Sequence, residues 1–274
     1  MYVKKVIYKN ELGMKLSADN RTVFCESIDA AGVAGNFITE APAFAPGQIT
    51  IDSQIAARVI PCSFAFRDTE AGELQRMELA EIFSPLLSGT LTVWGEENVY
   101  TIECRPQAVP SFKRDQSVPY IWRFDVDFVA DYPFWKYGSE HSFSAESSGD
   151  YVFAARSRLT LPLPVQIEIS DMTENVPYAF HIAAKKKTGD RLYYTRDAFS
   201  FFGKANTTFY VDGRTLSTQD SDGHSVNAVT SGSNSEKAVR YGYNYIWLEQ
   251  PTGATSHKRG RVTIRWHNLS LGVF

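Results

Sequence analysis

The chain has 274 residues, of which 43% are hydrophobic and 14% aromatic, so it can bury one large core or two of ordinary size. This composition excludes a disordered chain. The net charge is −3, which excludes the basic excess that binding to nucleic-acid phosphates needs. No apolar run reaches about 18 residues, so we expect no transmembrane helix and no membrane partner.

Short strands are predicted to dominate the first half, because apolar and polar residues alternate there. The segment Val59–Phe66 is expected to place Ile60, Cys62, Phe64 and Phe66 on one buried face. The segment Gly95–Asn98 has the length and composition of a hairpin loop. The strands predicted in this half before residue 110 are Val3–Tyr8, Gln48–Ser53 with Ile49 and Ile51 inward, Val59–Phe66, Leu91–Trp94 and Val99–Cys104.

The segment Ala30–Pro46 is rich in Ala, Gly and Pro and has no apolar period, so we predict a long loop. It nevertheless carries four side chains that are too apolar for a freely solvated loop. Burial on the same domain and burial against a neighbouring subunit are both compatible with this pattern. The four residues are candidates for an oligomer interface: Val33, Phe37, Ile38 and Phe44.

One helix is predicted at residues 70–85. Its apolar residues follow the spacing i, i+3, i+4, i+7, so they form a stripe that packs on a sheet. Pro85 and Gly89 are expected to end the helix. The stripe consists of Leu79, Ile82, Phe83 and Leu86.

The segment 120–137 predicts an amphipathic strand that marks a domain boundary. Apolar residues at 122, 124, 126 and 128 alternate with mostly polar ones, and Pro133 prevents the strand from continuing. Phe134 and Trp135 follow as aromatic anchors. The small, polar stretch Gly138–Gly149 resembles an inter-domain linker. We therefore predict two domains, residues 1–137 and 138–274.

The second half is predicted to be almost entirely β. Short strands separated by turn-rich spacers are typical of a β-sandwich or jelly roll. The predicted strands are Val165–Ser170, Tyr178–Ala184, Arg191–Thr195, Thr207–Val211, Ser225–Val229, Asn244–Glu249, Arg261–Trp266 and Leu269–Phe274. The whole chain is therefore predicted to be mainly β, with one helix in its N-terminal domain.

No residue pattern favours catalysis, a cofactor or a metal site. Asp125, Asp127 and Asp131 are the nearest approach to a carboxylate cluster, and we interpret them as the solvent face of a strand. The five histidines form no metal-binding or nucleophile-activating motif. Cys62 and Cys104 are expected to act as small core residues, and the odd cysteine count fits a protein folded in a reducing cytoplasm.

Aromatic residues alternate along one face of a predicted strand in the second half. They are Tyr241, Tyr243, Tyr245 and Trp247. Such a row can stack on sugar rings, contact another protein or fill the core of a sandwich. All three interpretations remain open at this point.

The order of motifs in residues 1–137 resembles the distal tail proteins of long-tailed phages. A first strand is followed by the glycine-rich Gly32–Gly35 and a short alternating strand. Then come the helix ending in Phe83-Ser84-Pro85-Leu86-Leu87, a strand pair, and the closing Tyr132-Pro133-Phe134-Trp135. The second half is similar, more loosely, to the galectin-like sandwich of that family. The galectin sugar-binding pattern is not found in it.

The resemblance implies a split-barrel or β-sandwich domain that forms a closed homo-hexameric ring, followed by a galectin-like β-sandwich. It implies a structural virion protein of the phage tail tip, made in the host cytoplasm, that is not an enzyme and uses no cofactor. The implied partners are copies of itself, the tail tube protein, the tail-tip protein and receptor-binding or adhesion proteins. It also favours burial of the 30–46 loop against a neighbouring subunit. The alternative is a carbohydrate-binding β-sandwich protein that attaches to the host surface.

Overall fold

In a computed structural model, the chain forms two compact units. The first unit consists of residues 1–138 and 270–274, and the second consists of residues 139–269. Each unit is described by itself. The structure describes residues 3–19, 21–30, 32–40, 49–68, 72–146, 151–155, 163–172, 177–188, 191–202, 204–215, 217–226, 228–231, 238–239, 242–249 and 260–273. Within those ranges none of the helices is long and apolar enough to cross a membrane.

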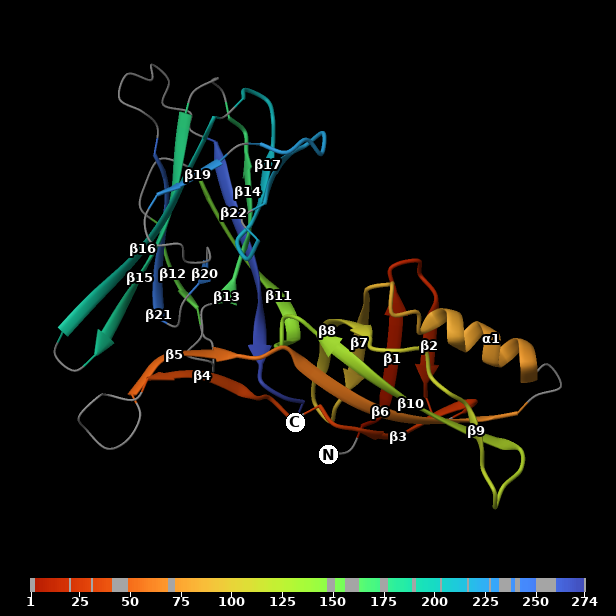
Figure 1. Cartoon of the computed structure of the whole chain (residues 1–274). Coiled ribbons are helices and arrows are strands. Elements are labelled where there is room, and N and C mark those ends of the chain that lie inside the picture. The colour runs from red at the N-terminus through yellow and green to blue at the C-terminus, as the bar shows by residue number, and fades with distance from the viewer. Residues whose placement is uncertain are drawn as a thin grey trace. The chain divides into compact units, whose positions relative to one another are not determined.

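The described residues are mainly β and contain a single α-helix, as the sequence predicts (Figure 1). The strands of the first unit and the start of the strand that leaves it are β1 (Lys5–Asn10), β2 (Lys15–Ala18), β3 (Val23–Ile28), β4 (Gly35–Glu40), β5 (Ile49–Ile55), β6 (Arg58–Arg67), β7 (Gly89–Trp94), β8 (Val99–Pro106), β9 (Lys113–Arg114), β10 (Ile121–Ala130) and β11 (Trp135–Glu146). The helix is α1 (Gly72–Ile82).

The first unit consists of two antiparallel layers that share one core. One layer pairs β2 with β1, β1 with β7 and β7 with β8, and the other pairs β3 with β6, β6 with β10 and β10 with β9. The two layers join where β8 pairs with β10 through Phe128 and Pro106. The predicted hairpin is confirmed, because β7 pairs with β8 and the amide of Gly95 donates to the carbonyl of Asn98 at 3.0 Å.

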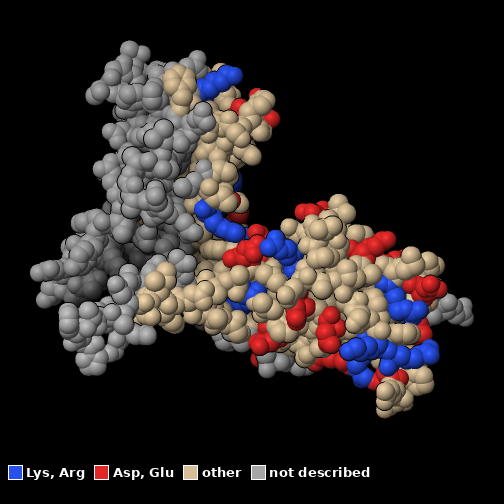
Figure 2. Space-filling model, in the orientation of Figure 1, with Lys and Arg blue, Asp and Glu red and all other residues tan. Residues whose placement is uncertain are grey.

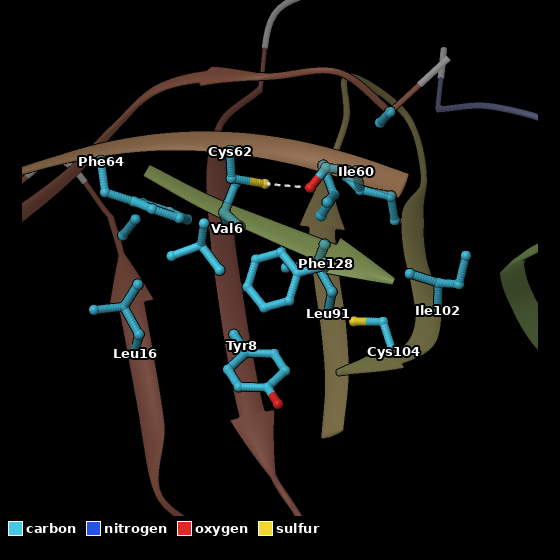
Figure 3. Packing of buried hydrophobic residues seen from close by; sticks show 14 of the residues in the cluster. Val6, Tyr8, Leu16, Ile60, Cys62, Phe64, Leu91, Ile102, Cys104 and Phe128 are labelled. Carbon is cyan, nitrogen blue, oxygen red and sulfur yellow. Dashed lines mark hydrogen bonds between the residues drawn. The ribbon is translucent and has the colours of Figure 1, made fainter. Parts of the chain in front are cut away.

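The core of the first unit is filled by the alternating faces of these strands (Figure 3). The predicted inward face of β6 is confirmed, since Ile60, Cys62, Phe64 and Phe66 are at most 2% exposed. Opposite them, Phe124, Val126 and Phe128 of β10 are equally buried. The alternation in both sequences therefore identified which face of each strand is inside.

The helix α1 packs on this core, but fewer of the residues in the predicted apolar stripe are buried than expected. Leu79 is buried, and Phe83, one residue beyond the helix, is fully buried against Tyr8, with ring centroids 5.7 Å apart. The prediction for Leu86 is wrong: this side chain is 90% exposed. The helix ends at Ile82, so Leu86 lies in a turn and the helical spacing no longer applies to it.

The described part of the second unit contains two larger antiparallel sheets that make a β-sandwich, and the separate short pair of β13 with β20. One sheet has the order β18-β17-β14-β22-β11 and the other the order β12-β21-β15-β16-β19. Its strands are β12 (Tyr151–Ala155), β13 (Leu163–Pro164), β14 (Gln166–Ser170), β15 (Pro177–Thr188), β16 (Arg191–Phe202), β17 (Phe209–Asp212), β18 (Thr218–Asp220), β19 (Ala228–Ser231), β20 (Ala238–Val239), β21 (Gly242–Glu249) and β22 (Arg261–Ser270). Their apolar alternation, seen in Ile167, Ile169, Val262 and Ile264, places buried side chains on one face of the sheet.

The prediction of a linker at Gly138–Gly149 is wrong for residues 138–146, because they belong to strand β11. In the second unit, β11 pairs with β22, and the hydroxyls of Ser144 and Thr263 lie 2.9 Å apart. The His141 ring stacks on Trp266 with centroids 5.6 Å apart. Small polar residues look like a linker when read alone, but here a partner strand supplies the missing hydrogen bonds.

The predicted closing strand Leu269–Phe274 is also wrong beyond Ser270, where β22 ends. The chain then returns to the first unit, where Val273 is 2% exposed within the core cluster. The last residues, from Leu271 on, therefore pack on the core of the first unit, and we call them the C-terminal strap.

Buried thiols predict a loss of stability in alkaline solution. Burial raises the pKa of Cys104 to about 12 and that of Cys62 well above its ordinary value. Above about pH 9 the unfolded chain loses thiol protons that the folded chain retains, so the free energy of unfolding falls as the pH rises. For Cys104 we expect a loss of roughly 1 kcal/mol at pH 10.

Urea unfolding under reducing conditions, compared between about pH 8 and about pH 10, measures this loss. The Cys104→Ala variant should show a flatter pH profile than the wild type, whatever its absolute stability. A wild-type free energy of unfolding that stays constant over this range would contradict the prediction.

Candidate functional site

The hairpin of β4 and β5 (Figure 1) carries two large apolar side chains that are exposed, Phe37 and Ile38. The prediction of a loop over Ala30–Pro46 is wrong for Gly35–Glu40, which form β4 and pair antiparallel with β5 from Gly35 opposite Ile55 to Glu40 opposite Ile49. The Ala, Gly and Pro content of the flanking residues obscured a β-forming Phe-Ile-Thr run, whose partner lies ten or more residues away in the sequence.

The hairpin is a separate two-stranded sheet in the described part of the chain. A lone two-stranded hairpin is marginally stable in water, and it leaves backbone donors and acceptors unpaired along both edges. Phe37 is 67% exposed and Ile38 is 54% exposed. Of the other interface candidates, Val33 is half-buried and Phe44 lies outside the described residues.

The base of the hairpin, at Ala30 and Arg58, is anchored by hydrogen bonds. The carbonyl of Ala30 accepts two hydrogen bonds, one from Nη1 of Arg58 at 3.1 Å and one from Nε1 of Trp135 at 3.2 Å. Arg58 also donates from Nη2 to the carbonyl of Leu271 in the C-terminal strap. Burial lowers the pKa of Arg58 to about 10, opposed by the charge of Asp29, so the guanidinium remains positive at neutral pH.

Charged side chains of both signs lie on the surface of the first unit. Figure 2 shows Lys and Arg side chains interspersed with Asp and Glu on its visible face. Several of these charges form ion pairs, among them Lys136 with Glu103 at 2.7 Å and Arg123 with Glu26 at 2.9 Å. A surface of this kind favours contacts between proteins over a polyanionic ligand.

Of the three carboxylates considered for chemistry, Asp125 and Asp127 lie on the solvent side of β10, and the exposed Asp131 follows the end of that strand. Asp125 accepts a hydrogen bond from Ser63 at 2.7 Å, and Asp131 faces Arg105 at 3.5 Å. Asp127 is also exposed. These contacts are typical of polar side chains on a protein surface, so we assign no chemical role to the three carboxylates.

The aromatic row of the second half falls on β21, except Tyr241, which lies outside the described residues. The side chains of Tyr243, Tyr245 and Trp247 also lie outside the description, so their three interpretations remain predictions. The described buried residues of this strand are Asn244 and Ile246.

Sequence reasoning missed a groove in the second unit with a volume of about 530 Å³. Its lining residues are Phe202, Lys204, Thr207, Phe209, Asp220 and Val226. They come from three separate segments, and no motif connects them. The only local signal was Asp220-Ser-Asp-Gly-His224, which reads as a turn.

That turn also brings together oxygen and nitrogen atoms of Asp220, Asp222 and His224 within 4.8 Å of one another. Oδ1 of Asp220 already accepts hydrogen bonds from the amides of Asp222 at 3.0 Å and His224 at 2.8 Å. We therefore assign this cluster to the structure of the turn and not to a metal ion.

No protein-family model and no functionally described protein matches the sequence. Solved structures do match, along nearly the whole chain. The crystal structure of the Dit protein of phage SPP1, described as a paradigm of the hub adsorption apparatus in phages that infect Gram-positive bacteria, has a TM-score of 0.63 at 9% identity and covers 97% of this chain and 99% of that chain. The phage P2 baseplate in its activated conformation with Ca has a TM-score of 0.54 at 8% identity and covers 100% of both chains.

These likenesses define the class of fold: a two-unit, mainly β chain of the kind found in phage baseplates. In particular, the fold is that of a Dit hub protein, so the fold expected from the sequence resemblance is confirmed.

Proposed function

We propose that this chain is a structural hub protein at the tip of a phage tail, where copies of it form a closed ring. The observation that carries the proposal is the match to the SPP1 Dit protein over 97% of this chain. In this role, the first unit builds the ring between the tail tube protein and the tail-tip protein. The second unit faces outward and holds receptor-binding or adhesion proteins. The role requires no catalytic step, and its place is the virion.

The β4–β5 hairpin is a second argument for the ring, because it pairs with no further strand among the described residues. A closed ring is built from heterologous contacts, so each subunit needs two different complementary faces. The hairpin offers one of them, since its strand edges pair with no other strand that the structure describes and Phe37 and Ile38 are exposed. Docking against a neighbouring subunit would remove this apolar surface from water and pair the free backbone groups.

The double variant Phe37→Asp/Ile38→Asp is expected to block ring formation while leaving the subunit folded. Light scattering of the wild type should give about six times the 30.8 kDa mass of one chain, and the variant should remain monomeric. Both side chains are more than half exposed, so circular dichroism of the variant should match the wild type. The control Val109→Asp replaces a 50% exposed side chain outside the hairpin and should assemble normally.

Two results would contradict this assignment. One is a double variant that assembles as the wild type does. The other is a tail tip that contains a single copy of the chain by electron microscopy. Hydrogen exchange adds a local test, since amides of residues 32–40 should gain protection only on assembly. If the amides of residues 32–40 were equally protected in monomer and ring, the contact between subunits would have to lie elsewhere, at α1 or at the β7–β8 hairpin.

A further inference from the structure

The groove of the second unit is open on one side and built from both apolar and polar side chains. Phe209 is 3% exposed and forms its floor together with Val226. Phe202 stands at its rim with 60% of its surface exposed. The volume of about 530 Å³ lies within the range of sites for small ligands.

Strand pairing brings the polar groups of the groove together. Phe209 of β17 is the direct partner of Asp220 of β18, and partners in an antiparallel pair present their side chains on the same face. The segment after Phe202 turns back at Lys204, whose carbonyl accepts the amide of Thr207 at 3.2 Å. Asn206 in this turn has a φ of 60° and donates its amide to the carbonyl of Met172 at 2.9 Å, which fixes the turn against the sandwich.

The carboxylate of Asp220 is oriented before any ligand arrives. Its Oδ1 atom accepts hydrogen bonds from the amides of Asp222 and His224, and its Oδ2 atom lies 3.5 Å from Nδ1 of His224. The hydrogen bond that the backbone amide of His224 donates is the main reason why the pKa of Asp220 is lowered. A fixed anionic acceptor costs little ordering entropy on binding.

We propose that this groove binds a neutral saccharide. An exposed aromatic face packs against the C–H face of a sugar ring, and Phe202 supplies such a face. The carboxylate of Asp220, which lines the groove, can accept hydrogen bonds from sugar hydroxyls, and Lys204 and Thr207 can donate hydrogen bonds to the sugar oxygens. The opposite charges of Asp220 and Lys204 leave the groove without a net sign, which fits an uncharged ligand. This assignment stands independently of the ring proposed above.

Binding to an array of immobilised neutral oligosaccharides of glucose, galactose, N-acetylglucosamine and N-acetylgalactosamine tests the proposal, with the labelled full-length chain as probe. We expect the wild type to bind at least one of them. Phe202→Ala should weaken that binding about ten-fold. The variant Lys204→Ala should weaken it less.

Tyr210→Ala is the matched control. Tyr210 is an exposed aromatic residue on β17, next to Phe209, and it does not line the groove. Its variant should bind the saccharide as the wild type does. Failure of the wild type to bind every saccharide on the array would overturn the proposal, as would equal losses for Phe202→Ala and Tyr210→Ala. Unchanged binding by a folded Phe202→Ala variant would also overturn it.

Discussion

Replacing Trp135 with alanine should lower the free energy of unfolding of the first unit by about 3–5 kcal/mol. The indole is fully buried, and its loss leaves a cavity between the start of β11 and the base of the hairpin. The hydrogen bond to Ala30 is a smaller part of the effect, because Arg58 still donates to that carbonyl. Scanning calorimetry of the full-length chain measures the change.

The variant Trp135→Phe separates packing from hydrogen bonding. It keeps most of the apolar volume and removes only the N–H donor, so its loss should be much smaller than that of the alanine variant. An alanine variant as stable as the wild type, with weaker binding to a partner, would show that Trp135 is a contact residue and not an anchor.

Removal of residues 271–274 should destabilise the first unit by a similar amount, roughly 3–5 kcal/mol. The deletion takes Val273 out of the core and removes the Leu271 carbonyl that Arg58 contacts. A buried guanidinium then loses an acceptor, which costs more than the hydrogen bond alone contributed. Thermal unfolding of the truncated and complete chains gives the difference.

Leu271→Ala is the control for this truncation. It retains the backbone carbonyl and changes a side chain that is already 38% exposed, so its stability should lie within about 1 kcal/mol of the wild type. If the truncated chain unfolded at the same temperature as the complete one, the strap would have no role in the first unit.

The sequence alone determined the strand faces and the fold class. Alternation placed Ile60 to Phe66 and Phe124 to Phe128 in the core, because a period of two fixes which side of a strand is apolar wherever one side is buried. Pro133 identified the end of β10 for an equally local reason. The order of these motifs was also sufficient to suggest the phage hub fold.

Only the tertiary structure decided the features that depend on partners distant in the sequence. Residues 35–40 stand in a segment rich in Ala, Gly and Pro, and residues 139–146 are mostly small or polar. Both segments are strands because β5 and β22 pair with them. The return of Val273 to the first unit and the meeting of Phe202 with Asp220 leave no local signal. Strand pairing and core packing are set by non-local hydrogen bonds and buried area, which no window of neighbouring residues contains.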